Sequence, residues 1–339
     1  MQINALKGDR TMSIRPRLSR SLLCGLLAAS LAAAAFAAQR TARIEGAVLS
    51  DGVVVDAVHS IAYVMHPNGG VQAVDLEKGV ALWRSTAAER PLALAGGLLV
   101  AQARPGEHGE LRIVALDLRK RGAASSEADL PMPSGVRAEV AETVEQAFRV
   151  TASASSQGIL VAWETQEMPS LPGRRIARLG ATKSAAVAEP GTLQGTAMFD
   201  LHTGRLLPMK AAGAQIAAWP VVASLSSPAA AERLFASADG RHVLASRRVG
   251  DDRSGAPYRW TISDAASGTV LGTVRAGTSM SPFTVAGTRL VYVAQPATRR
   301  EGSKWIEEPL RLRAVDLATG REVWTREIRD TAFRGPSPL

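Results

Sequence analysis

Short apolar runs alternate with polar stretches along most of the chain, and they recur in pairs. In each pair, a four-residue run rich in aliphatic side chains precedes a second run that ends at an aspartate. Runs of this length between turn-forming residues predict β-strands. The first runs are Ile61–Val64, Leu98–Ala101, Ile159–Ala162, His242–Ala245 and Leu290–Val293, and the aspartates are Asp75, Asp117, Asp200, Asp264 and Asp316. Helical periodicity is weak, and Val136–Ala147 is the one short candidate for a helix.

The motif A-V-D-L-x-x-G-x-x-x-W occurs twice, near the two ends of the chain. An aspartate can accept hydrogen bonds from the backbone N–H groups that follow it, and a glycine four positions later can take the positive φ that closes a tight turn. The tryptophan can pack between neighbouring small sheets and bury on the order of 200 Å². We therefore interpret the aspartates as turn residues and not as catalytic acids or metal ligands. The motif residues are Ala73, Asp75, Gly79 and Trp83, and then Ala314, Asp316, Gly320 and Trp324.

The three middle copies of the motif are degenerate. The step of four residues from aspartate to glycine is kept in Asp200–Gly204 and Asp264–Gly268, whereas Asp117 reaches Gly122 one residue late. The tryptophan is lost in all three, and Pro208 and Gly272 stand at its place in the last two.

The two complete copies resemble the tryptophan-docking repeat of the PQQ-type β-propellers, with Lys78 as the one departure from the usual threonine. This family includes the quinoprotein alcohol dehydrogenases and non-enzymatic relatives, among them an outer-membrane assembly lipoprotein. The resemblance implies an all-β fold, a β-propeller of four-stranded antiparallel blades. Five blades are visible, and further blades have room in residues 122–147 or 214–226. We also expect a strand near residues 42–49 to pair with the last blade, because an open ring leaves exposed strand edges.

The distance from the first run of a pair to its aspartate varies. It is short from Val64 to Asp75 but long where it includes residues 164–195 and 295–309. If the two runs are strands B and C of each blade, the long segments are B–C loops, which all emerge on one face of a propeller. A loop-decorated face is typical of a binding surface, although loop tips also tolerate insertions without any function. Trp305, among charged residues at one loop tip, is a candidate partner contact, with folding back onto its own blade as the alternative.

Composition is that of an ordinary globular protein, with 46% hydrophobic and 21% charged residues. The formal net charge is +9, but residues 1–37 hold five basic residues and one acidic residue. The remainder therefore carries 35 basic and 30 acidic residues, a net charge of +5. No basic run with interleaved aromatic residues is present, so we expect no nucleic-acid partner.

The first 37 residues predict a secretory signal peptide. The basic segment Arg15–Arg20 precedes the apolar segment Leu22–Ala34, and Ala35-Phe36-Ala37 forms a cleavage site. The apolar segment is too short for a comfortable membrane span, so we expect a periplasmic or secreted protein without one. Met12 is an alternative start of the signal. The predicted division is a signal peptide (1–37), a PQQ-like propeller (38–330) and a C-terminal tail (331–339).

No catalytic, cofactor-binding or metal-binding residues are predicted. Cys24, the single cysteine, lies inside the apolar segment and not at its end, which disfavours lipidation and leaves the mature chain without a thiol. The five histidines are scattered without metal-ligand spacing. The resemblance implies that a quinoprotein enzyme would hold PQQ against a cysteine pair and bind calcium through glutamate and asparagine beside a catalytic aspartate. We can assign none of these positions here, so we expect no PQQ and no catalysis.

Two functions stay open on the sequence. The first is a periplasmic scaffold that binds another envelope protein through its loop-decorated face. The second is a ligand-binding or enzymatic propeller with a site in the central channel. Polar side chains that converge in the channel would favour the second function, and an apolar patch around Trp305 would favour the first. A role in outer-membrane assembly, by analogy with the lipoprotein relative, is a third and weaker option.

Overall fold

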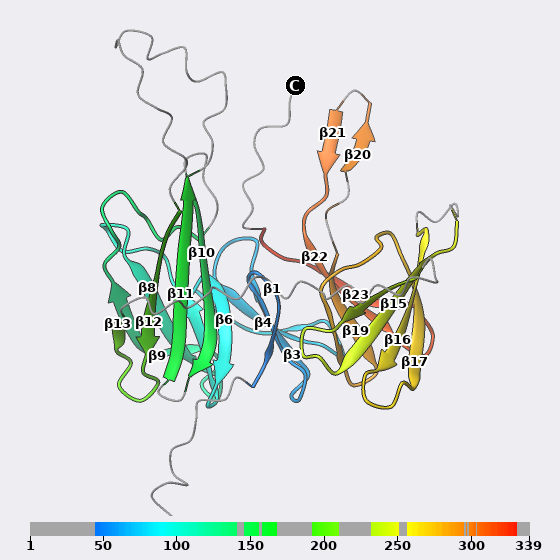
Figure 1. Cartoon of the computed structure of the whole chain (residues 1–339), viewed down its shortest axis with the longest axis horizontal. Helices are drawn as coiled ribbons and strands as arrows, with labels where there is room; N and C mark the ends of the chain where they lie inside the picture. Colours follow the sequence, from blue (N-terminus) through cyan, green and yellow to red (C-terminus); the bar gives the residue numbers. More distant parts are fainter. Residues whose placement is uncertain are drawn as a thin grey trace, which may run out of the picture. The chain divides into compact units, whose positions relative to one another are not determined.

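The described chain folds into five antiparallel β-sheets of four or five strands and one two-stranded hairpin (Figure 1). The computed structural model describes residues 45–140, 146–155, 158–167, 192–209, 232–250, 256–294, 296, 298–302 and 304–330. These residues contain no helix. The all-β class and the four-stranded antiparallel blades predicted from the sequence are thus confirmed, with five blades in the described part of the chain.

The strands follow the chain order within each blade. Blade 1 contains β1 (Ala47–Ser50), β2 (Val53–Asp56), β3 (Ile61–Met65), β4 (Val71–Asp75) and β5 (Ala81–Ser85). Blade 2 contains β6 (Arg90–Ala95), β7 (Leu98–Gln102), β8 (Leu111–Asp117) and β9 (Ala123–Leu130). Blade 3 contains β10 (Gln146–Ser155), β11 (Gly158–Glu167), β12 (Thr192–Phe199) and β13 (Leu206–Met209).

Blade 4 contains β14 (Glu232–Ala236), β15 (His242–Arg248), β16 (Tyr258–Asp264) and β17 (Val270–Ala276). Blade 5 contains β18 (Phe283–Ala286), β19 (Arg289–Ala294), β22 (Arg311–Asp316) and β23 (Glu322–Glu327). A separate hairpin, β20 (Thr298–Glu301) and β21 (Lys304–Glu307), lies between β19 and β22. The last four strands of blade 1 and the four strands of every other blade are called A to D below.

The C–D turns have the chemistry that the sequence predicts. Asp75 Oδ1 accepts hydrogen bonds from the backbone N–H groups of Glu77 and Lys78 at 2.8 and 2.9 Å. Gly79, with φ of +68°, donates its N–H to the carbonyl oxygen of Asp75. The same side-chain and backbone bonds recur at Asp200 and Asp264. The turn after Asp117 is one residue longer and places Arg121 at a positive φ of 55° before Gly122.

Neighbouring blades pack through these turns. The residue four positions after a turn glycine lies against the turn of the next blade: Trp83 lies on Gly122, Ser126 on Gly204, and Trp324 on Gly79. Gly272 takes the same position against the carbonyl group of Leu317, where a Cβ atom would collide. Small residues thus replace the tryptophan without changing which segments meet.

Four hydrophobic clusters join the blades of the described residues. They connect blade 1 with blade 2, blade 2 with blade 3, blade 1 with blade 5, and blade 4 with blade 5. The first and last blades therefore share one core. None of these clusters contains residues of both blade 3 and blade 4.

Three expectations differ from the structure. Strand β1 pairs with β2 and not with the last blade, because Asp51 and Gly52 (φ +74°) close a local hairpin between them. Residues 122–139 hold β9 and an extended connection, not a sixth blade or a helix. Val136, Ala138 and Val140 are buried with a period of two, which suits an extended chain.

Several predictions lie outside the described residues. These are the sixth blade in residues 214–226, the signal peptide with Cys24, and the tail 331–339. The division into domains therefore stays a prediction. No helix of the described part is long and apolar enough to cross a membrane.

Candidate functional site

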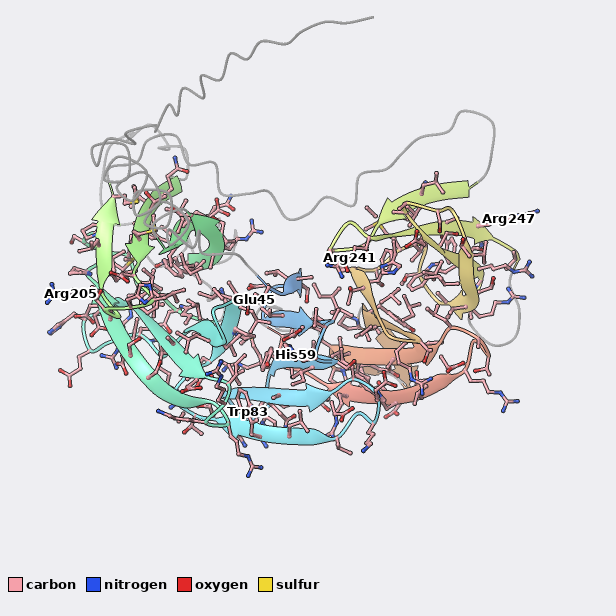
Figure 2. The ribbon with its side chains drawn as sticks, turned by 90° about the horizontal axis from the view of Figure 1, so that it is seen from below. Glu45, His59, Trp83, Arg205, Arg241 and Arg247 are labelled. Atoms are coloured by element: carbon pink, nitrogen blue, oxygen red, sulfur yellow. The ribbon has the colours of Figure 1, made fainter. Side chains whose placement is uncertain are left out.

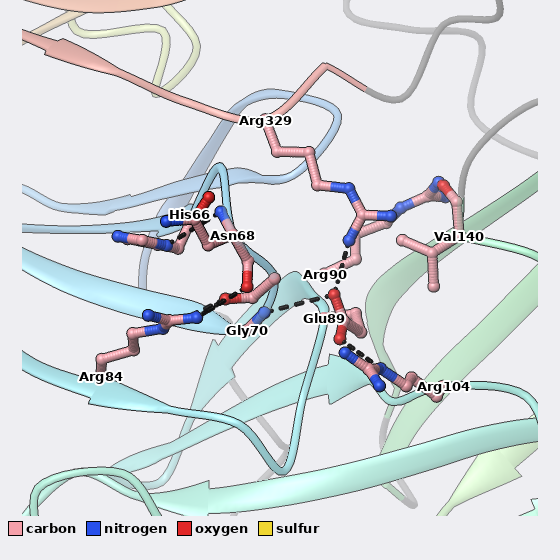
Figure 3. Close-up of polar contacts among 10 residues, drawn as sticks. His66, Asn68, Gly70, Arg84, Glu89, Arg90, Arg104, Val140 and Arg329 are labelled. Atoms are coloured by element: carbon pink, nitrogen blue, oxygen red, sulfur yellow. Dashed lines mark hydrogen bonds and ion pairs between the residues drawn. The ribbon is translucent and has the colours of Figure 1, made fainter.

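Polar side chains converge where the B–C loops and the D–A connections of blades 1, 2 and 5 meet (Figure 3). Glu89 and Arg90 lie at the start of β6, and Arg104 follows β7. Arg329 follows β23, and its backbone N–H donates to the carbonyl oxygen of Met65 at the end of β3. Antiparallel strands place these segments at one end of the blades, which we call the B–C face. The C–D turns lie at the other end.

Glu89 is the centre of this group. Its side chain is 3% exposed, and its carboxylate accepts hydrogen bonds from Arg104 Nε at 2.7 Å and from Arg329 Nη1 at 2.6 Å. A third bond comes from the backbone N–H of Gly70 in the B–C loop of blade 1, at 3.2 Å. Glu89 thus holds together blade 1, blade 2 and the segment after blade 5.

The surroundings of Glu89 favour its charged form. Burial alone would raise the pKa of Glu89, but the hydrogen bonds from Arg104 and Gly70 and the charge of Arg329 outweigh it. The pKa of this carboxyl group therefore lies below its ordinary value. A buried carboxylate that stays ionised keeps both arginine side chains in place.

The loop of blade 1 beside Glu89 is also fixed. Arg84 Nη2, at the end of β5, donates to the carbonyl oxygens of Asn68 and Gly69 at 2.8 and 2.7 Å. In the connection after blade 2, the carbonyl oxygen of Val140 accepts a bond from the buried Arg90. The backbone around the site is therefore held by guanidinium groups on both sides.

A cavity of about 390 Å³ opens beside Glu89. The side chain of Arg104 is 78% exposed and that of Arg137 is 57% exposed, and Arg137 Nε donates to Glu139 at 3.2 Å. Guanidinium groups present planar donors that suit carboxylate and phosphate groups. The cavity can therefore bind an anionic group of a partner or ligand. Its lining residues are Glu89, Arg104, Pro105, Arg137, Glu139, Val140 and Arg329.

The two predicted insertions lie in B–C loops, at the same end of their blades. The first is shorter than expected, because β11 continues to Glu167 and β12 begins at Thr192, and the residues between them lie outside the described part. The second contains the β20–β21 hairpin. Trp305 is in β21, opposite Arg300. Its side chain lies outside the described part of the chain, and its role as a partner contact stays a prediction.

The residues of the repeat motif lie away from this cavity. Asp75, Asp117, Asp264 and Asp316 each end a C strand, and Asp200 directly follows one, so all five lie at the C–D turns. Sequence reasoning missed Glu89, Arg104, Arg137 and Arg329, which come from separate segments and share no local motif. In the described residues, no group of three or more His, Cys, Asp or Glu side chains could hold a metal ion.

A second hollow lies among the A–B turns of blades 1, 4 and 5. Its volume is about 540 Å³, and its lining includes Val58, Arg241 and Gly287. Nearby lies His59, which Figure 2 labels. His59 Nδ1 is 2.7 Å from Asp56 Oδ2, and this hydrogen bond raises the pKa of His59. The Asp56 carboxylate also accepts hydrogen bonds from the backbone N–H groups of Val58 and His59. The close approach of Asp56 and His59 therefore follows from the structure of this turn and needs no ligand.

Comparison with known proteins adds little to the site. No family model and no curated protein matches the chain. A solved structure of BamB from Moraxella catarrhalis is 12% identical, with a TM-score of 0.22, over 82% of this chain and 63% of BamB. The Cps50 (Swd1) β-propeller domain of Myceliophteria thermophila is 12% identical, with a TM-score of 0.23, over 86% of this chain and 90% of that domain. The Dos1 propeller is 11% identical, with a TM-score of 0.24, over 82% of this chain and 69% of that structure.

This chain spans less than two thirds of the length of the BamB chain. Scores at this level say nothing about the site or a partner. The assignment to the β-propeller class rests on the five sheets described above.

Proposed function

We propose that this chain is an exported propeller of the PQQ-type repeat class that binds another envelope protein through its B–C face and has no catalysis of its own. Export is inferred from the basic and apolar segments before Ala37. The repeat class is inferred from the two complete copies of the motif that end at Trp83 and Trp324.

The observation that carries the proposal is the cavity beside Glu89. The buried carboxylate fixes Arg104 and Arg329 without covering the guanidinium group of Arg104. A rigid arginine side chain loses little conformational entropy on binding, which favours recognition of a carboxylate on a partner. Five of the seven lining residues are charged, whereas the pockets that hold most small molecules are lined mainly by hydrophobic and aromatic side chains. A surface acidic group of a protein is therefore the better fit.

Site-specific photo-crosslinking in cells tests which face meets the partner. A photoreactive residue at His108 or Glu301 reports on the B–C loops of blades 2 and 5, and one at Lys78 or Ala266 reports on the C–D turns. All four positions are exposed. We expect a discrete protein adduct from the first pair only. Adducts of equal yield from the C–D turns, or none from the B–C loops, would contradict the proposal.

Two double variants test the role of the arginines in the adduct. R104Q/R137Q removes two positive charges beside the cavity, whereas the control R205Q/R321Q removes two exposed charges from C–D turns. We expect the first to lose most of the adduct and the control to keep it. Circular dichroism and the melting temperature show whether each variant is folded.

Binding of a small anionic ligand in the same cavity is the second candidate. The convergence of Arg104, Arg137 and Arg329 around one hollow favours it. Titration of the protein with PQQ and calcium, followed by quinone absorbance and melting temperature, separates the two functions. Stoichiometric binding that R104Q/R137Q abolishes would favour the ligand, and an unchanged melting temperature would favour the protein partner.

A further inference from the structure

Three arginines form a row across blade 4. In the register of the sheet, Arg247 in β15 lies directly opposite Arg259 in β16, which lies directly opposite Arg275 in β17. Directly opposed residues of antiparallel strands point to the same side of the sheet. All three side chains are exposed. We call these residues the arginine row; Figure 2 labels Arg247.

The arginine row lies on the face of blade 4 that points away from blade 5. The neighbouring register position holds Ser246, Trp260 and Val274, and the last two are buried in the cluster shared with blade 5. Because side chains alternate along a strand, the row faces the other way. On that face, the next position along the strands holds Ala245, Thr261 and Thr273, which are small. The hydrophobic clusters of the described residues do not include these side chains.

Other blades place their arginines differently. In blade 2, Arg112 lies directly opposite Asp129, and Arg112 Nε is 2.8 Å from its carboxylate. In blade 3, Arg149 lies directly opposite Glu164, with Arg149 Nη1 at 2.9 Å from the carboxylate. In blade 4, Arg247 lies directly opposite Glu232 of β14 on one side, but on its other side it faces Arg259, which in turn faces Arg275, although like charges at opposed positions destabilise a sheet.

We propose that the arginine row binds an acidic helical segment of a partner protein. Neighbouring strands are about 4.8 Å apart, so three guanidinium groups form a ladder across the sheet. Glutamates at positions i, i+4 and i+7 of a helix follow one another at a similar spacing, roughly 5–6 Å between neighbouring side chains. A helix laid across the strands can thus bring carboxylates to Arg247 and Arg259, over a floor of threonine and alanine. A single phosphate group would engage only part of the row.

This surface is separate from the cavity beside Glu89. It is built by the strands of blade 4, whereas the cavity is lined by residues of blade 2, the connection after it and Arg329. The two surfaces can therefore be tested independently. R104Q/R137Q removes charge at the cavity, and R247Q/R259Q removes charge from the row.

Fluorescence anisotropy with a labelled helical peptide tests the proposal. The peptide carries glutamates at i, i+4 and i+7, and a control peptide of the same composition distributes them around the helix. We expect the full chain to bind the first peptide more tightly than the second, and less tightly as the salt concentration rises. R247Q/R259Q should weaken binding about tenfold or more. R205Q/R321Q, which removes two exposed charges from C–D turns, should leave it unchanged.

Each contrary outcome has a distinct meaning. Equal affinity for the two peptides, or equal weakening by R205Q/R321Q, would show that only net charge matters and would overturn the proposal. Tighter binding of inorganic polyphosphate or of vesicles containing anionic lipid than of the peptide would overturn the choice of a protein ligand. A second variant, R247K/R259K, keeps the charge but loses the planar donors. Retention of full affinity by this variant would contradict recognition by paired guanidinium and carboxylate groups.

Discussion

The indole nitrogen of Trp324 donates a hydrogen bond to the backbone carbonyl of Leu76, 248 residues earlier in the chain, at 2.9 Å. The ring of Trp324 also lies on Gly79 in the same turn, and Arg326 Nε donates to the carbonyl oxygen of Gly79 at 2.6 Å. The last strand of blade 5 thereby meets the first C–D turn of the chain. This contact and the hydrophobic cluster that blades 1 and 5 share, and not a shared strand, join the two ends of the described fold.

Removal of the Trp324 side chain should destabilise the whole fold. Trp324→Ala loses the packing on blade 1 and the hydrogen bond to Leu76, and because the indole is only half-buried we expect a loss of about 2–4 kcal/mol in the free energy of unfolding. Trp324→Phe keeps most of the packing and should cost about 1 kcal/mol. Urea denaturation measures both. Equal losses for the two variants would contradict a role of the ring in packing.

Two turn glycines separate a backbone effect from a packing effect. Gly79 and Gly268 have φ values of +68° and +71°, but only Gly79 has the ring of Trp324 above it, and Gly268 has open space. Gly268→Ala should cost about 1 kcal/mol for the left-handed backbone alone. Gly79→Ala adds a steric clash and should cost roughly 1–3 kcal/mol more. Chemical denaturation of both variants gives the difference, and equal costs would contradict the contact between blades 5 and 1.

The turns and strands could be predicted from the sequence because their causes are local. An aspartate that can accept hydrogen bonds from the following N–H groups and a glycine that can take a positive φ stand within five residues of each other, as Asp75 and Gly79 do. Ser126 stands four residues after Gly122, as Trp83 stands four residues after Gly79, so its place in the turn contact can be found by counting along the sequence. The pairing of residues 42–49 was predicted wrongly because the turn at Asp51 and Gly52 joins β1 to β2 locally.

The site could not be predicted in the same way. Glu89 meets Arg104, Gly70 and Arg329 across 15, 19 and 240 residues of sequence. No local spacing carries that information, because it depends on how blades 1, 2 and 5 pack. The arginine row of blade 4 is intermediate in how far it can be predicted from the sequence. Arg247, Arg259 and Arg275 are visible in the sequence, but their alignment needs the register of three strands.

The charge on Glu89 should make the stability of the fold depend on pH in the acidic range. The pKa of Glu89 is lowered in the folded state, so its contribution is present above its unfolded pKa of about 4.5 and is lost as the pH falls through the lower, folded pKa. Glu89→Gln should cost about 2 kcal/mol at pH 7, because two arginines lose a charged acceptor. Melting curves from pH 7 to pH 3 should show this difference shrink on acidification. A difference independent of pH would contradict the assignment.

The Asp56–His59 pair predicts a titration with the opposite sign. The hydrogen bond to Asp56 raises the pKa of His59, so its stabilising contribution is present below about pH 6.5 and is lost as the pH rises through the folded pKa. Asp56→Asn keeps an oxygen acceptor for the backbone N–H groups of Val58 and His59 but removes the charge. An NMR titration of the His59 ring should show its pKa fall in this variant. An unchanged pKa would mean that Asp56 does not hold the imidazolium ion.

The arginine row should cost stability in the absence of a ligand. Like charges at directly opposed positions destabilise a sheet, and each pair is worth about 0.2–1 kcal/mol. Arg259 takes part in two such pairs, so Arg259→Thr, which also favours the strand, should raise the free energy of unfolding. Arg112→Thr is the matched control, because Arg112 faces Asp129 and Glu127, and its loss should lower stability slightly. Thermal and urea denaturation of both variants at low salt measures the sign. If Arg259→Thr lowered stability as Arg112→Thr does, Arg259 would have an acidic partner within the chain, and the repulsion between the arginines would no longer argue for an external ligand.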